Sequence, residues 1–278
     1  MTTPAPASAR ERFAEAVARP EPEIDLASAA LLIAAEEYPQ LTPEPYLQRL
    51  DVLAERVRDR LADENAPLIV LQELSRVLFE EEHFRGNAGN YYDPRNSFLN
   101  DVLDRRLGIP LTLCIVYLEV GWRLGLPLAG VNFPGHFVVR YEGEALRLLA
   151  DPYQEGAIRF EEDAQGLLDQ VAGGQLELQA THLRSADRRD ILVRLLTNLK
   201  SIYLNARDDV KALGAMERIL IIRPDAADEV RDHALALTRL GRGAEAMHGL
   251  QEYLRLAPDA TDRMRIQLLL EHLAQSGR

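Results

Sequence analysis

The chain has 278 residues, enough for one large domain or two modest ones, and 47% of them are apolar. Its formal net charge of −12 repels phosphate backbones, so nucleic acid is not an expected partner. A single cysteine excludes an internal disulfide, and there is neither a long apolar run nor a basic-then-apolar leader, so we expect a cytoplasmic protein that does not span a membrane.

The first part of the chain is predicted to be helical after a loose N-terminal arm. Residues 1–22, which are rich in Ala, Pro and Glu, are expected to form this flexible arm. Apolar residues at helical spacing then predict helices over residues 24–38, 43–63 and 67–82. These helices precede the segment that carries the candidate chemistry.

The most apolar helix is predicted over residues 110–124 and carries the only cysteine, Cys114. Residues 83–95 contain several Gly and Asn residues and a Pro in quick succession, which predicts a loop before it. Pro110 suits the first turn of the helix, where a missing N–H costs little. Because apolar residues lie on all sides of this helix, it should be the buried central helix of its domain.

Strands follow the central helix and are expected to bring a histidine opposite an aspartate. Residues 136–142 and 145–151 read as two strands around Gly143-Glu144, which suits a two-residue type II′ hairpin. With that turn, counting outward along both strands places His136 opposite Asp151. A carboxylate in this position can fix the tautomer of the imidazole ring. A slip of one residue would instead put the two side chains on opposite faces.

The last part of the chain has an internal period of 34 residues. Arg223-Pro224 and Ala257-Pro258 are one period apart, and so are the small residues Ala212 and Ala246. A helix-turn-helix period of this length, with small residues where helices cross and proline at the end, resembles tetratricopeptide repeats. Two copies and a final helix over residues 261–275 would bury a common core, with the last helix as a cap.

Three segments carry a resemblance to a known family. They are N-Y-Y-D-P-R-N-S-F-L-N-D-V-L-D-R-R-L-G-I-P-L-T-L, V-N-F-P-G-H-F-V-V-R and L-A-D-P-Y-Q-E-G. In this order they resemble the SirB-type family of the transglutaminase-like superfamily, in which tetratricopeptide-like helices follow the first domain. The resemblance implies an α+β fold: a papain/transglutaminase-like domain of helices and a small antiparallel sheet over residues 23–183, then an all-α tetratricopeptide-like domain over residues 184–278.

The same resemblance implies a thiol site with a cysteine near the start of the central helix and with His and Asp on neighbouring strands. His136 and Asp151 match the last two positions. The position implied for the cysteine is Leu111, whereas Cys114 lies one turn further along the helix. The effect of a helix N-terminus fades after the first turn, and the apolar neighbours of Cys114 suit a core residue. Cys114 is therefore either a nucleophile activated by His136 or a buried structural residue.

A polar loop before the central helix supplies further candidates. Its side chains could line the same cleft as His136, or they could serve only as turn and cap residues. The cleft-lining candidates are Asn90, Tyr92, Asp93 and Asn96, together with Leu111 on the helix. A metal site built from His136, Asp151 and Asp93 has no H-E-x-x-H or C-x-x-C spacing to support it, so we expect neither a metal ion nor a cofactor.

Two hypotheses for function follow. In the first, the chain is a catalytically degenerate module that binds a protein or peptide partner through its repeats. In the second, it is a thiol hydrolase or acyl transferase that acts on amides, with Cys114 as nucleophile, His136 as base and Asp151 as the group that orients the base. Whether Cys114 reaches His136 decides between them.

Overall fold

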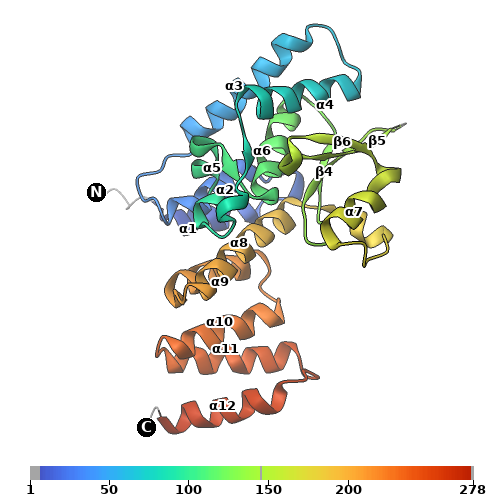
Figure 1. Ribbon diagram of the computed structural model, residues 1–278. Coiled ribbons are helices and arrows are strands. Elements are labelled where there is room, and N and C mark those ends of the chain that lie inside the picture. The colour runs from blue at the N-terminus through green and yellow to red at the C-terminus, as the bar shows by residue number, and fades with distance from the viewer. Residues whose placement is uncertain (1–6, 145, 277–278) are drawn as a thin grey trace, which may run out of the picture. The chain divides into compact units, whose positions relative to one another are not determined.

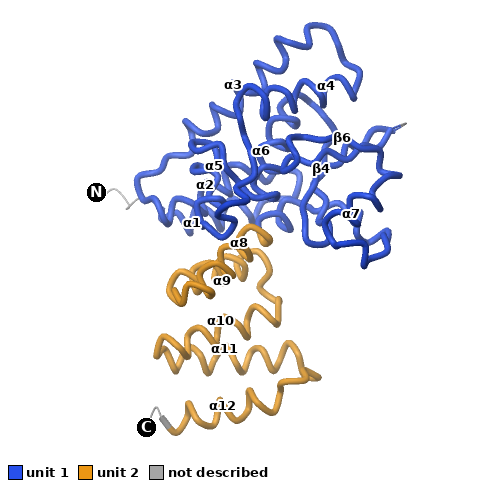
Figure 2. The backbone as a smooth tube through the Cα atoms, in the orientation of Figure 1, with its two compact units in different colours: residues 1–192 blue, residues 193–278 orange. Residues whose placement is uncertain are grey.

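The structure is a computed structural model that describes residues 7–144 and 146–276 (Figure 1). The chain divides into two compact units, residues 1–192 and residues 193–278 (Figure 2). The division falls inside helix α8 (Arg188–Asn205), later in the chain than the boundary expected at residue 184. In the described ranges, helices and strands make up the first unit, and the second is helical throughout.

The N-terminal segment begins with a packed helix, α1 (Ala9–Ala18). The hydroxyl of Ser8 accepts a hydrogen bond from the main-chain N–H of Glu11, whose carboxylate accepts one from the N–H of Ser8 in return. Phe13 and Val17, one turn apart, are buried. The expectation of a flexible arm over residues 1–22 is therefore wrong for α1, because this cap and this apolar pair start and anchor a helix. Residues 1–6 of the expected arm lie outside the described residues.

The next helices follow the predicted apolar periods. They are α2 (Leu26–Ala35), α3 (Glu44–Leu61) and α4 (Pro67–Ser75), and α4 continues into a π-helical segment, Arg76–Glu81. A short helix, α5 (Leu99–Arg105), follows the polar loop and ends at Arg106, which is in the left-handed conformation with φ 57°.

Helix α6 (Pro110–Arg123) is the centre of the first unit, as its apolar sequence predicted (Figure 1). Every residue from Pro110 to Gly121 is buried. The helix contacts α2 and α3, and it also contacts two strands, β3 (Leu128–Val131) and β4 (Val138–Glu142). Cys114 thus lies on a helix that is enclosed by both the helical layer and the sheet.

The sheet of the first unit is antiparallel and has the strand order β6-β5-β4-β3-β7. Its remaining strands are β5 (Arg147–Asp151), β6 (Ala157–Phe160) and β7 (Ser185–Ala186). Helix α7 (Ala164–Ala172) packs Leu167 and Leu168 into a core with the apolar residues of β3, β4 and β5. A separate parallel pair, β1 (Arg85–Gly86) and β2 (Leu107–Gly108), flanks the polar loop.

The β4–β5 hairpin has a different register from the predicted one. Glu142 pairs with Arg147 and not with Ala145, which lies outside the described residues, so the expected two-residue turn is wrong. The partner is displaced by two positions, and an even displacement keeps every side chain on its face of the sheet. His136 lies before β4, in a turn where its N–H donates to the carbonyl of Phe133 at 3.0 Å. The Asp151 side chain therefore lies on the predicted face of the sheet, although each residue of β4 pairs with a different residue of β5 than predicted.

The second unit has the predicted period of 34 residues. After α8 come α9 (Asp209–Ile222), α10 (Ala227–Arg239), α11 (Gly243–Leu256) and α12 (Arg263–Ser276), and α9 and α11 begin and end one period apart. Ala212 and Ala246 are fully buried, as the repeat pattern requires. At the crossing of α10 and α11, a β-carbon on Gly249 would lie 2.9 Å from that of Ala234, so only glycine allows this approach. Among the described residues, no helix has the length and apolar character needed to cross a membrane.

Candidate functional site

His136 and Asp151 form a hydrogen-bonded pair. The Nε2 atom of His136 lies 2.9 Å from Oδ2 of Asp151, and both side chains are buried, with exposed fractions of 7% and 3% for the two residues. The predicted pairing of these residues is thus confirmed. Because an ionised carboxylate can only accept, it favours the tautomer with its proton on Nε2, which leaves the lone pair of Nδ1 as the basic position of the ring.

The carboxylate of Asp151 is held on its other side by the main chain. Its Oδ1 atom accepts hydrogen bonds from the N–H groups of Tyr153 at 3.0 Å and Gln154 at 3.3 Å, which caps the 3₁₀ turn Pro152–Gln154. The segment A-D-P-Y-Q-E-G therefore has a local reason for its composition: Asp caps the turn and Pro occupies its first position. With one oxygen fixed in this way, the other is presented to His136 in a defined direction.

Tyr153 extends the pair on one side, and sequence reasoning missed it. Its ring lies edge-on to the imidazole of His136, with ring centroids 6.0 Å apart and an interplanar angle of 78°. Burial, followed by the charge of Asp151, raises the pKa of Tyr153, so the phenol stays neutral. The ring occupies the space beside Gly86, where a β-carbon would lie 2.3 Å from its Cε2 atom. The sequence signal was present in the D-P-Y turn and in a glycine on a strand.

Cys114 contacts the main chain next to His136, and its side chain is buried in the core. It is fully buried, and its Sγ donates to the carbonyl oxygen of Phe137, the residue after His136, at 3.2 Å. A sulfur that donates a hydrogen bond is a neutral thiol and not the thiolate that attacks a substrate. Leu111, at the position that the resemblance gives to the cysteine, is an apolar residue with 2% exposure.

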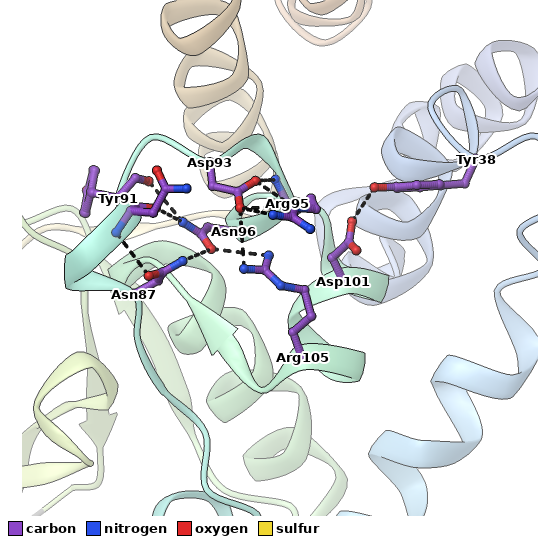
Figure 3. Close-up of polar contacts among 9 residues, drawn as sticks. Tyr38, Asn87, Tyr91, Asp93, Arg95, Asn96, Asp101 and Arg105 are labelled. Carbon is purple, nitrogen blue, oxygen red and sulfur yellow. Dashed lines mark hydrogen bonds and ion pairs between the residues drawn. The ribbon is translucent and has the colours of Figure 1, made fainter.

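The polar loop is organised by the side chain of Asn96 (Figure 3). Its Nδ2 donates to the main-chain carbonyls of Asn90 and Tyr91, and its Oδ1 accepts from Asn87. The main-chain carbonyl of Asn96 accepts from the hydroxyl of Thr112 at 2.7 Å, which fastens the loop to the first turn of α6. Asn96 is therefore fully used in holding the loop in place.

Asp93 is the ionic part of the same loop (Figure 3). Arg95 donates to both of its carboxylate oxygens, and Arg105 approaches within 3.6 Å. The hydrogen bond from Arg95 lowers the pKa of Asp93, so this carboxylate is ionised at neutral pH. Tyr92, by contrast, is 69% exposed. These contacts give the loop residues structural roles, and their expected place in a cleft with His136 stays a prediction.

Metal binding finds no support in the arrangement of the side chains. Within residues 7–144 and 146–276, no group of three or more His, Cys, Asp or Glu side chains is placed to hold a metal ion. His136 and Asp151 are used by one another, and Asp93 is used by two arginines. The arrangement at this place is a histidine ring hydrogen-bonded to one carboxylate.

Comparison with protein families assigns each of the two units to a family. Residues 44–197 match the model of the transglutaminase-like superfamily, and residues 199–271 match a tetratricopeptide repeat model. The first match contains both members of the His136–Asp151 pair and Cys114, and the second contains helices α9, α10 and α11. The predicted order of the two domains is confirmed.

Relatives similar over most of their length carry the UPF0162 name. The chain is 37% identical to a UPF0162 protein of Xylella fastidiosa over 84% of this chain and 85% of the relative, and 34% identical to one of Pseudomonas aeruginosa over 90% and 91%. A shorter likeness, 43% identity over 72 residues, links 26% of the chain to 12% of mouse F-box only protein 21. The chain belongs to the transglutaminase-like superfamily and, within it, to the SirB-type UPF0162 proteins.

Proposed function

We propose that this chain is a catalytically inactive member of its superfamily that binds a protein or peptide partner through its helical repeats. Catalytic inactivity is supported by the surroundings of Cys114, which is fully buried and donates a hydrogen bond from its thiol to the carbonyl of Phe137. A nucleophile must meet its substrate as an activated thiolate within reach of a base. The His136–Asp151 pair then acts as a structural element that fastens the end of β5 to the turn before β4.

The repeats offer a binding surface of the right kind. In the second unit, a cavity of about 440 Å³ is lined by side chains from α9 and α10 and from the chain before α9. Its apolar residues include Met216 and Leu235, and its rim carries Arg239 in an ion pair with Asp209 at 2.7 Å. Apolar floor and mixed-charge rim together suit a peptide with an apolar anchor between charged residues.

Charge reversal at the rim tests the binding half of the proposal. Arg239→Glu in the full-length chain should strongly reduce the recovery of proteins that the wild-type chain captures, measured by quantitative mass spectrometry. Arg255→Glu is the matched control, since Arg255 is also exposed and also paired with a neighbouring acid, Glu252. Equal capture by both variants would remove the repeat cavity as the docking surface.

A second function, a cysteine-dependent amide hydrolase or acyl transferase, is favoured by one observation. The Nε2–Asp151 hydrogen bond prepares His136 to accept a proton at Nδ1, as a general base must. In that case Cys114 is the nucleophile and must become accessible in the folded protein. The two functions therefore differ in what they require of one thiol.

A further inference from the structure

The turn between α8 and α9 holds an arginine where the turn between α10 and α11 has a glycine. Arg207 and Gly241 are one period of 34 residues apart, and both have positive φ angles, 59° and 75°. The N–H groups of the residues that follow them, Asp208 and Arg242, each donate to a helix carbonyl five residues earlier at 2.9 Å. The two turns are therefore the same helix-ending turn with a different residue at its left-handed position.

Arg207 is held in a conformation that favours glycine. Glycine has no β-carbon to clash at positive φ, whereas an L-residue loses free energy there. The Arg207 side chain is exposed, and within the described residues its guanidinium forms no hydrogen bond or ion pair. Because no contact of this side chain offsets the cost of its main-chain conformation, its presence points to a partner from outside the chain.

Arg207 lines the repeat cavity of about 440 Å³ and contributes a positive charge to it. The other cation of the cavity, Arg239, pairs with Asp209 at 2.7 Å. The second acid, Asp232, pairs with Lys200 at 3.4 Å. Among the described residues, the cavity thus keeps one uncompensated positive charge, in a chain whose net charge is −12. An anionic group is attracted at this place and repelled by the chain as a whole.

Apolar side chains lie beside this charge. Leu204 at the end of α8 and Leu235 on α10 are half-buried and line the same cavity. The cavity volume is within the range of sites that hold a small ligand. A cation next to an apolar wall is complementary to an acidic group next to an apolar one.

We propose that the repeat cavity binds a peptide segment in which an aspartate or glutamate stands beside a large apolar residue. The carboxylate pairs with the planar guanidinium of Arg207, and the apolar side chain packs against Leu204 and Leu235. A basic segment is disfavoured, since its charge would lie beside that of Arg207. This inference rests on the proposed binding of a partner by the repeats and names the chemistry of the bound segment.

Two matched peptides test the charge of the segment. N-acetyl-leucyl-glutamyl-leucinamide carries one carboxylate, and its glutaminyl analogue carries none. NMR titration of the ¹⁵N-labelled full-length chain should give an affinity about two- to fivefold higher for the glutamyl peptide, the effect of one exposed ion pair. The main-chain resonances of Arg207 and Leu235 should shift. Equal affinities, or shifts confined to other residues, would overturn the proposal.

Removal of the charge alone provides the second arm. Arg207→Gln should bring the affinities for the two peptides to equality, because an amide cannot form the ion pair. Arg255→Gln is the matched control, since Arg255 is also an exposed arginine of the second unit and pairs with Glu252. It should keep the preference for the glutamyl peptide. Loss of the preference in both variants, or in neither, would contradict the assignment to Arg207.

Arg207→Gly tests why the turn keeps an arginine. The variant has the residue that Gly241 already provides in the equivalent turn. It should lose the preference for the glutamyl peptide and raise the midpoint of thermal unfolding, because glycine adopts a φ of 59° without strain. A lower midpoint would show that the Arg207 side chain stabilises the fold and would refute its retention for a ligand.

The failure of this inference and that of the proposed function give different results. If Arg239→Glu reduces the capture of proteins but the two peptides bind equally, the repeats bind a partner and the inferred acidic segment is wrong. If capture is unchanged but the wild-type chain prefers the glutamyl peptide and Arg207→Gln does not, the cavity binds an acidic segment and the captured proteins dock elsewhere.

Discussion

At the scale of single residues, the carboxylate of Asp151 sets the tautomer of His136. Asp151→Asn should keep its Oδ1 on the N–H groups of Tyr153 and Gln154, which turns the amide Nδ2 toward the histidine. An amide N–H needs an acceptor, so the imidazole must carry its proton on Nδ1 instead of Nε2. ¹⁵N shifts of the ring should report this exchange, with a loss of about 1 kcal/mol or less in unfolding free energy because the hydrogen bond is re-formed. An unchanged Nε2–H signal would contradict the assigned geometry.

Gly86 holds the space for the Tyr153 ring beside the pair. Gly86→Ala places a β-carbon 2.3 Å from that ring, so the ring must move away from its place against His136. Overpacking of this kind should cost about 1–3 kcal/mol of unfolding free energy, measured by urea denaturation. Gly89→Ala is the control, since nothing lies within 4 Å of its β-carbon position. Equal stability of the two variants would show that the ring has room.

The hydrogen-bonded pair could be predicted because the chemistry of its two residues and their places in the sequence were sufficient. His136 and Asp151 could be named from their types and their places around a turn. Tyr153 was missed although the D-P-Y turn and the strand glycine Gly86 carried a signal, because its contact with His136 joins segments that lie far apart in the sequence. For Asn96 the sequence left two roles open, because an asparagine in a loop has the same signature whether it lines a cleft or ties the loop together, and the structure shows the second role.

At the scale of elements, a buried carboxylate ties two helices together. Glu119 of α6 accepts a hydrogen bond from the N–H of Ala27, in the first turn of α2, at 2.9 Å and pairs with Arg123. Burial raises the pKa of Glu119 more than Arg123 lowers it. A raised folded-state pKa means that the stabilising contribution is complete below the ordinary pKa of glutamate and is lost as pH rises through the folded-state value.

Glu119→Gln removes this pH dependence and keeps an acceptor for Ala27. The unfolding free energy of the variant relative to wild type should therefore increase as pH rises from about 4 to about 7, measured by urea unfolding at each pH. Glu252→Gln should change in the opposite sense, because its hydrogen bond with Arg255 lowers the pKa of Glu252. A relative stability of Glu119→Gln that falls with pH would refute this role.

Most helices and strands could be predicted from the sequence, and the two errors, in the hairpin register and in helix α1, have physical causes. The hairpin register was missed because a glycine after a strand suggests a short turn, while the strands pair only from Glu142 and Arg147 outward. The predicted face of Asp151 is nevertheless correct, because the register error is two residues and side chains alternate between faces with a period of two. Helix α1 was missed because composition was weighed above the Ser8–Glu11 cap, which is a local and specific signal.

At the scale of the whole molecule, the two parts were predictable to different degrees. The repeats could be read from their period, because each helical repeat packs mainly on its neighbours in sequence. The fold of the first domain was predicted from three motifs in a characteristic order, which do not show what the thiol of Cys114 contacts. What the thiol of Cys114 contacts depends on how α6 packs against the residues before β4, a long-range relation that the local sequence does not contain.

The histidine–aspartate pair lies next to a thiol that belongs to the core. The rate at which iodoacetamide alkylates Cys114 near neutral pH, followed by mass spectrometry in the folded and the denatured chain, tests this arrangement. We expect labelling only after denaturation, and no slower labelling of folded His136→Ala than of folded wild type. Fast labelling of the folded protein that His136→Ala slows would instead establish Cys114 as an activated nucleophile.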